Sequence, residues 1–138
     1  MNVHTTNYQD TLIEVAEDCP VACGVIPPQK EGQPTTASLQ FDLLKSNPYK
    51  FTSDDILFRV YALKKGIPER VWEEERKVFF SKGQACLRAS PLTKRYGWGV
   101  HSNEKGLIAI YGMQTEAYRK LQKDPSLRKL KAMRLKRA

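Results

Sequence analysis

Apolar residues recur with a helical period in three segments of the first two thirds of the chain. The first segment begins at Thr36 and ends near Asn47, because the proline that follows at position 48 disfavours helix in the residue before it. The second runs from Ser53, a good capping residue, to Gly66, a residue type that commonly ends helices. The third follows Pro68, which suits the first turn of a helix. The short connection between the last two predicts an antiparallel or sharply angled helix pair.

Extended segments are predicted on either side of these helices. Residues 11–16 (TLIEVA) are rich in β-branched side chains and predict a strand. Residues 98–102 and 107–111 predict a hairpin, since Gly106 suits the left-handed position of the loop between them. Residues 85–89 are also expected to be extended. Ser90 and Pro91 predict a short helical turn through Arg95, and Thr115 predicts the cap of a helix over residues 116–123.

The order of these elements predicts an α+β fold, with a small antiparallel sheet of three to four strands and helices packed mainly on one face. The chain has 138 residues, which is within the usual range of one domain, so we expect a single domain over residues 1–138. Leu127, Leu130, Met133 (or Arg134) and Leu135 lie at helical spacing near the end of the chain. They predict a basic C-terminal helix over residues 125–138.

The basic character of the chain is concentrated in that last segment. The formal net charge is +8, and residues 125–138 contain six basic residues and no acidic one, which leaves only +2 for the rest. The six are Arg128, Lys129, Lys131, Arg134, Lys136 and Arg137. Clustered cations release counterions from a phosphate backbone, so one hypothesis is a nonspecific nucleic-acid-associated protein, or one that binds another acidic macromolecule. The alternative is a solvated helix face whose leucines dock on the domain.

Composition also indicates the compartment. The longest purely apolar run, Leu107 to Tyr111, is far shorter than the ~20 residues that a membrane helix needs. The first ten residues, MNVHTTNYQD, lack the basic and apolar regions of a signal peptide. The three cysteines are an odd number, so we expect free thiols, no disulfide and a cytoplasmic protein.

Four stretches of the sequence are similar to a known family. They are MNVHTTNYQDTLIEVAEDCP, NPYKFTSDDILF, FFSKGQACLRASPLTKRYGWGVHSNEKGLIAIYG and KAMRLKR. The chain resembles a family of small bacterial proteins known only as a domain of unknown function, and the resemblance covers nearly all of it. The resemblance implies a soluble, single-domain bacterial protein. It implies no activity, ligand or catalytic residue.

The segment from Gly83 to Gly112 holds the best candidates for a ligand site. We expect its extended pieces to gather polar side chains around a shared hollow that prefers anions, since basic side chains and free backbone N–H groups at a helix start bind phosphate or carboxylate. The candidate ligand-binding residues are Arg88, Ser90, Lys94, Arg95, Trp98 and His101. The alternative is that Ser90 only caps a helical turn and that the aromatic side chains only pack in the core.

Catalysis and metal binding are weaker hypotheses. Cys86 lies two residues from Arg88 and is a candidate nucleophile, and His101 is a candidate general base. The alternatives are an inert core thiol and a solvent-facing hairpin histidine. Cys19 and Cys23 form C-x3-C with His4 upstream, but a structural zinc site normally has four ligands. No phosphate loop or nucleophile elbow is present, so we assign no catalytic residue, metal or cofactor.

The first hypothesis is therefore a small cytosolic binding or interaction module, as a monomer or homodimer, with an anion-preferring cleft. The nucleic-acid-associated protein is the second. A small enzyme that uses Cys86 or His101 is the third.

Overall fold

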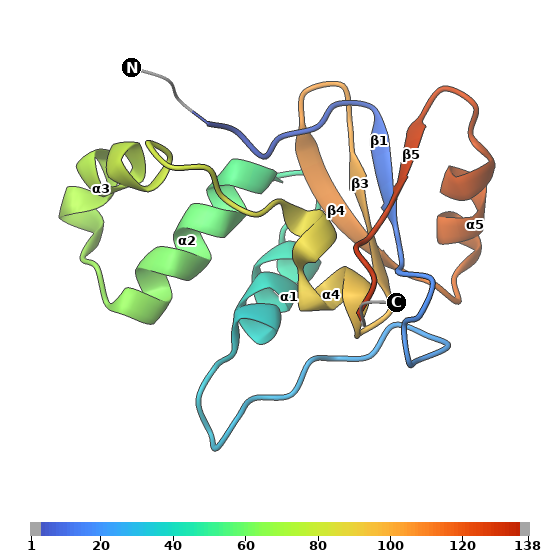
Figure 1. Cartoon of the computed structure of the whole chain (residues 1–138), viewed down its shortest axis with the longest axis horizontal. Helices are drawn as coiled ribbons and strands as arrows, with labels where there is room; N and C mark the ends of the chain where they lie inside the picture. The colour runs from blue at the N-terminus through green and yellow to red at the C-terminus, as the bar shows by residue number, and fades with distance from the viewer. Residues whose placement is uncertain (1–3, 136–138) are drawn as a thin grey trace.

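The computed structural model describes residues 4–135, which form an α+β fold around one five-stranded sheet (Figure 1). The strands are β1 (Thr11–Glu14), β2 (Phe51–Thr52), β3 (Trp98–Ser102), β4 (Leu107–Gly112) and β5 (Arg128–Lys131). The α-helices are α1 (Thr36–Ser46), α2 (Ser53–Lys65), α3 (Trp72–Phe79), α4 (Pro91–Lys94) and α5 (Glu116–Lys123). Two 3-10 helices, η1 (Glu69–Val71) and η2 (Leu87–Ala89), complete the set.

The predicted α+β class is confirmed, whereas the predicted sheet was only roughly right. The strand order is β2-β4-β3-β1-β5. The three pairs among β2, β4, β3 and β1 are antiparallel, and β5 pairs with β1 in parallel, so the sheet is mixed and has one strand more than expected. The β3–β4 hairpin has the predicted turn, because Gly106 adopts a φ of +79° and the side chain of Asn103 accepts from the backbone N–H groups of Lys105 and Leu107.

Threonine side chains begin the two long helices. Thr35 caps α1 and Thr52 caps α2, each in a reciprocal capping box, so the cap of α2 is one residue earlier than the predicted Ser53. Gly66 ends α2 in the left-handed conformation that the sequence predicted. The predicted end of α1 near Asn47 is also confirmed.

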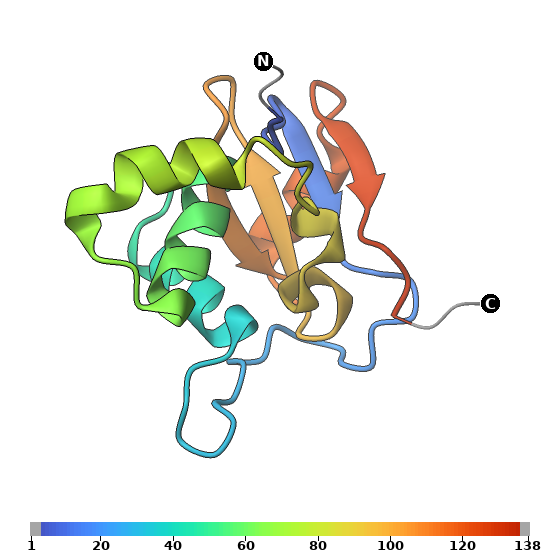
Figure 2. The same ribbon diagram turned by 60° about the vertical axis from the view of Figure 1, so that its left-hand side comes forward.

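The helices form two layers of unequal size on the sheet (Figure 2). On one face, α1, α2 and α4 bury the largest cluster, in which Phe41, Ile56 and Leu92 pack against the strand residues Ile13 and Val100. On the other face, Tyr118 of α5 packs with Leu12, Val15 and Leu127. Residues that alternate along a strand therefore meet different surroundings.

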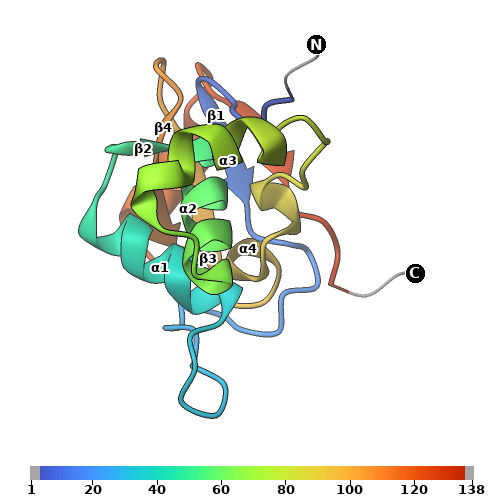
Figure 3. The same ribbon diagram turned by 90° about the vertical axis from the view of Figure 1, so that its left-hand side faces the viewer.

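α3 lies on the outer side of α2, away from the sheet (Figure 3). A third cluster joins these two helices through Phe58, Ala62 and Phe80, with Phe79 and Trp72 packed against them. Among the described residues, no helix is long and apolar enough to cross a membrane.

The structure corrects two predicted elements. Residues 85–89 are not a strand, because Leu87–Ala89 form η2, where only Leu87 is buried deeply. The predicted basic C-terminal helix over 125–138 is wrong across its described part, where Arg128–Lys131 are strand β5. The reason is nonlocal: one edge of β1 needs a hydrogen-bonding partner, and β5 supplies it over four residue pairs. Positions 136–138 lie outside the described residues.

Candidate functional site

The six residues predicted to line one hollow lie on both faces of the sheet. Trp98 is 7% exposed in the main core, where its ring is 5.2 Å from that of Phe41 and its Nε1–H donates to the carbonyl of Val25 at 2.9 Å. His101, three residues further along β3, points to the opposite face. The two side chains therefore belong to different surroundings.

Arg88 attaches the end of the chain to the domain. Its Nε–H donates to the carbonyl oxygen of Lys131 at 2.7 Å, and its own carbonyl accepts from the N–H of Met133 at 2.8 Å. Since Arg88 belongs to η2, it does not share a strand face with Cys86 as predicted. Its internal hydrogen bonds give it a structural role at the β5 edge.

Lys94 and Arg95 follow at the end of α4. Lys94 is half-buried and Arg95 is exposed, and neither side chain contacts a carboxylate within residues 4–135. Ser90 caps α4 as predicted, and its Oγ accepts from the N–H of Leu92 at 3.1 Å. That N–H group at the helix start is therefore already satisfied by the protein.

A groove between α1, α2 and the segment before α4 contains Ser90, and we call it the α1–α2 groove. Its wider part has a volume of about 450 Å³. It is lined by Thr36, Gln40, Leu57, Val60, Tyr61, Lys64 and Lys65. A narrower part of about 160 Å³ shares Thr36, Gln40 and Leu57 and adds Ala85, Cys86, Ala89, Ser90 and Pro91. The two parts lie next to each other, since these three residues line both, and we treat them together.

Gln40 is the unusual residue of this groove. It is only 2% exposed, and its Oε1 accepts a hydrogen bond from Ser90 Oγ at 2.5 Å. Since Ser90 Oγ already accepts from Leu92, its own proton goes to Gln40, which orients the amide. The amide nitrogen Nε2 then has no protein acceptor within the described chain, yet no described side-chain nitrogen is both fully buried and unpartnered. Nε2 therefore keeps some contact with solvent, and Gln40 lines both parts of the groove.

Two lysines of the last turn of α2 make the groove positive. Lys64 Nζ donates to Thr36 Oγ1 at 3.0 Å, which holds it beside the start of α1, and Lys65 is exposed beside it. No carboxylate within residues 4–135 forms an ion pair with either lysine. The groove thus combines an almost fully buried amide side chain, two cations and apolar walls.

Sequence reasoning missed Gln40, Lys64 and Lys65. One signal was available: Gln40 lies one residue before Phe41 and three after Ala37, on the apolar stripe of its helix. A polar residue there needs a buried partner. Here Ser90 is the partner of the amide oxygen of Gln40, and the amide nitrogen has none in the described chain.

Cys86 lines the narrow part of the groove, and no histidine or carboxylate of residues 4–135 forms a hydrogen bond with it. Its Sγ is 3.6 Å from the phenolic oxygen of Tyr8, and the hydrogen bond with Cys86 together with burial raises the pKa of Tyr8. The phenol therefore stays protonated at neutral pH and does not activate the thiol. This neighbour gives no support to a nucleophilic cysteine.

His101 is half-buried, so its interpretation as a solvent-facing hairpin residue was wrong. Its Nδ1 is 2.7 Å from Tyr49 Oη, which is also 2.7 Å from Tyr111 Oη. Burial lowers the pKa of His101, and the charges of Asp124 and Asp10 oppose that shift only in part. His101 and Cys86 lie on opposite sides of the sheet, so they do not form one catalytic site.

The basic residues near the end of the chain do not share one face. Along β5 the side chain of Arg128 lies on one side of the strand, and those of Lys129 and Lys131 lie on the other. Lys129 Nζ donates to the backbone carbonyls of Asp124 and Leu127, and Arg134 is exposed beyond the strand. Lys136 and Arg137 lie outside the described residues. The described basic residues therefore do not form the helical surface on which the nucleic-acid hypothesis depended.

The cysteines considered as zinc ligands differ in their exposure to solvent. Cys19 is half-buried, Cys23 is exposed, and all three cysteines are free thiols. Over residues 4–135 no three His, Cys, Asp or Glu side chains are grouped so that they could hold a metal ion.

The protein is therefore a small α+β protein with a groove between two helices. The walls of the groove are largely apolar, and the polar side chains of Gln40 and Ser90 line it as well. The chain belongs to a family of unknown function, DUF6157, whose model matches residues 3–138. The comparisons with curated proteins and with solved structures give no significant match.

Proposed function

We propose that this chain is a small-molecule-binding protein that takes an organic carboxylate with an apolar body into the α1–α2 groove. The observation that carries the proposal is the Gln40 amide, which is almost fully buried, oriented by Ser90 and without a protein acceptor within the described chain. Nε2 keeps some contact with solvent, since no described side-chain nitrogen is both fully buried and unpartnered, and a ligand oxygen atom can replace the water that it meets there.

Charge favours an anionic oxygen over a neutral one. Lys64 and Lys65 line the groove without a carboxylate partner in residues 4–135. A carboxylate can accept from Gln40 Nε2 while its negative charge lies near these two ammonium groups. The sequence pattern predicted that Arg88, Lys94 and Arg95 bind the anion. The present proposal assigns that role to Lys64 and Lys65.

The walls favour an apolar body. Leu57 and Val60 face the wide part, and Ala85, Ala89 and Pro91 face the narrow part. The volume of about 450 Å³ lies within the usual range for small-molecule sites. An aliphatic carboxylate fits this combination better than inorganic phosphate, which has no apolar surface to bury.

Titration calorimetry with hexanoate and with 1-hexanol, at constant ionic strength, tests the proposal. We expect saturable binding of hexanoate, and an affinity for the alcohol at least about tenfold lower because the alcohol lacks the charge. Gln40→Met keeps the approximate side-chain volume and removes the donors, so it should weaken hexanoate binding about tenfold. Gln29→Met is the matched control, because Gln29 is exposed in the loop before α1.

A second variant separates recognition from folding, since Gln40→Met also deprives Ser90 of its acceptor. Lys64→Met with Lys65→Met changes exposed side chains and should weaken hexanoate binding while the far-ultraviolet circular dichroism stays native. The proposal is wrong if hexanoate shows no saturable binding, or if the folded Gln40 and lysine variants bind it as tightly as the original chain.

A further inference from the structure

A second groove lies on the other side of α2, between that helix, α3 and β2. Its volume is about 400 Å³, and it shares no lining residue with the α1–α2 groove. Three cations line it, Lys50, Arg59 and Arg76, together with the carboxylates of Asp55 and Glu73. We call it the Arg59 groove.

Arg59 is held by aromatic rings instead of by carboxylates. Its guanidinium carbon is 4.6 Å from the ring centre of Phe51 and 5.4 Å from that of Trp72. The side chain is half-buried, and within residues 4–135 none of its N–H groups has a hydrogen-bond acceptor. Packing against aromatic rings limits the orientations of the guanidinium plane and leaves the N–H donors at its edge unused.

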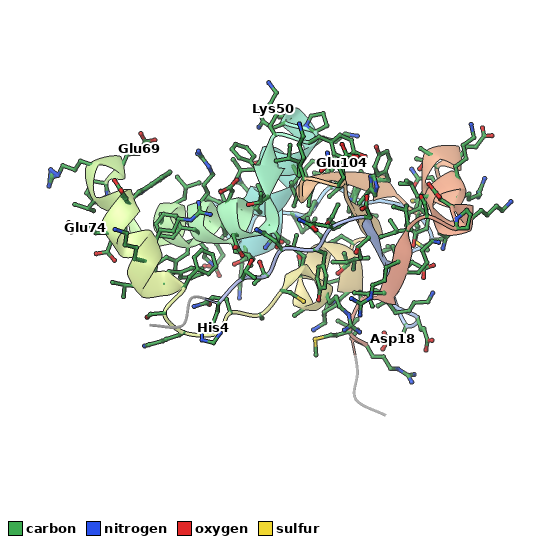
Figure 4. The ribbon with its side chains drawn as sticks, turned by 90° about the horizontal axis from the view of Figure 1, so that it is seen from above. His4, Asp18, Lys50, Glu69, Glu74 and Glu104 are labelled. Atoms are coloured by element: carbon green, nitrogen blue, oxygen red, sulfur yellow. The ribbon has the colours of Figure 1, made fainter. Side chains whose placement is uncertain are left out.

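Some of the other charged side chains of the groove form an ion pair, and others do not. Arg76 donates to Asp55 Oδ1 at 2.7 Å. Burial alone would raise the pKa of Asp55, but hydrogen bonds from Thr52 and Arg76 hold it below its usual value, so this ion pair is fully charged at neutral pH. Among the residues that line this groove, Lys50 and Arg59 are the cations without a carboxylate partner in the described chain, and Glu73 is the carboxylate without a cationic one. Lys50 extends outward at the edge of the molecule (Figure 4).

We propose that the Arg59 groove binds a phosphoryl group, either as free phosphate or as the monoester of a small organic molecule. Arg59 donates two N–H groups to phosphoryl oxygens, as a guanidinium fork does when it binds an oxyanion. Lys50 supplies the second positive charge, which favours a dianion over a monoanion. This proposal is independent of the carboxylate proposed for the α1–α2 groove, because different residues carry it.

Fluorescence of Trp72 gives a direct readout, since its ring lies against Arg59. The full chain with Trp98→Phe, which leaves Trp72 as the only tryptophan, is titrated with inorganic phosphate, phenyl phosphate and benzoate at pH 7.5 and constant ionic strength. We expect saturable changes with phosphate or phenyl phosphate, at least about tenfold tighter than with benzoate. Tighter binding of phenyl phosphate assigns the site to a monoester, and tighter binding of inorganic phosphate assigns it to the free ion. Because Trp98 is a core residue, the titrations with phosphate and phenyl phosphate are repeated on the unmodified chain and followed by 31P NMR as a second measurement.

Variants separate a binding role from a merely structural one. Arg59→Met keeps an unbranched side chain beside the rings of Phe51 and Trp72 and should weaken phosphate binding at least about tenfold. Arg70→Met, at an exposed arginine of η1, should leave phosphate binding unchanged. Glu73→Gln should tighten binding because it removes a like charge, and Glu74→Gln is its control, since Glu74 points away from the fold (Figure 4). Absence of saturable phosphate binding, or equal affinity in the Arg59 and Arg70 variants, overturns the proposal.

Discussion

The phenolic oxygen of Tyr49 lies 2.7 Å from Nδ1 of His101, a residue on the central strand β3. Tyr49 reaches this position from the turn before β2, where it adopts a φ of +58°, a conformation that is rare for a bulky side chain. Its N–H donates to the carbonyl of Ile108, and its hydroxyl also contacts Tyr111. Hydrogen bonds from both its backbone and its side chain therefore hold the turn against the sheet and offset the backbone strain.

This network predicts that stability depends on the protonation of His101. Burial lowers the pKa of the folded imidazole, so below neutral pH the unfolded chain binds a proton more readily than the folded one. The stability that His101 contributes is thus fully present above its ordinary pKa of about 6.5 and is lost as pH falls through the folded pKa. Urea unfolding at pH 7.5 and pH 5 should show a larger loss in the original chain than in His101→Gln, which does not titrate. Equal losses would contradict the prediction.

A close approach between β3 and α5 predicts a second effect. A Cβ atom added at Gly99 would lie 2.3 Å from Cε1 of Tyr118, which is buried and accepts a hydrogen bond from the N–H of Val15 at 2.9 Å. Gly99→Ala must therefore displace Tyr118, and we expect it to lower the free energy of unfolding by about 2–3 kcal/mol. Gly83→Ala is the control, because its nearest added contact is His4 Nδ1 at 3.9 Å, and it should stay within about 0.5 kcal/mol. Denaturant unfolding of both variants measures the difference.

Asp54 attaches the N-terminal segment to α2 and carries a third prediction. Its carboxylate accepts from Thr5 Oγ1, Thr6 N and Thr6 Oγ1, each at 2.7 Å. Asp54→Asn replaces one acceptor oxygen with a donor, so we expect a loss of about 2 kcal/mol and faster hydrogen exchange at the Thr6 amide. Asp42→Asn, at an exposed position of α1, should change neither measurement. If the exchange rate at Thr6 does not change, Asp54 does not hold this segment.

Elements with local signals could be predicted from the sequence, and elements fixed by distant partners could not. The helix α2 and the β3–β4 hairpin carry their own capping and turn residues, such as Gly66 and Gly106. The spacing of Leu127 and Leu130 fits a helix, but the free edge of β1 makes the segment a strand, and no local pattern records that edge. In the same way, the partners of Gln40 and Arg59 come from other segments of the chain, Ser90 for the first and Trp72 for the second. Sequence patterns alone did not bring these groups together.

Arg88 offers a fourth prediction, because it distinguishes the site predicted from the sequence from the one proposed from the structure. Its Nε–H donates to the carbonyl of Lys131 in β5, and an exposed hydrogen bond of this kind contributes about 0.5–1.5 kcal/mol to stability. Arg88→Met should therefore lower the free energy of unfolding by that amount and speed hydrogen exchange in β5, while the affinity for hexanoate stays the same. Arg95→Met, at an exposed side chain without a partner in the described chain, should change none of the three. If Arg88→Met instead abolishes hexanoate binding and leaves the exchange of β5 unaltered, Arg88 belongs to an anion site and the assignment of that role to the α1–α2 groove fails.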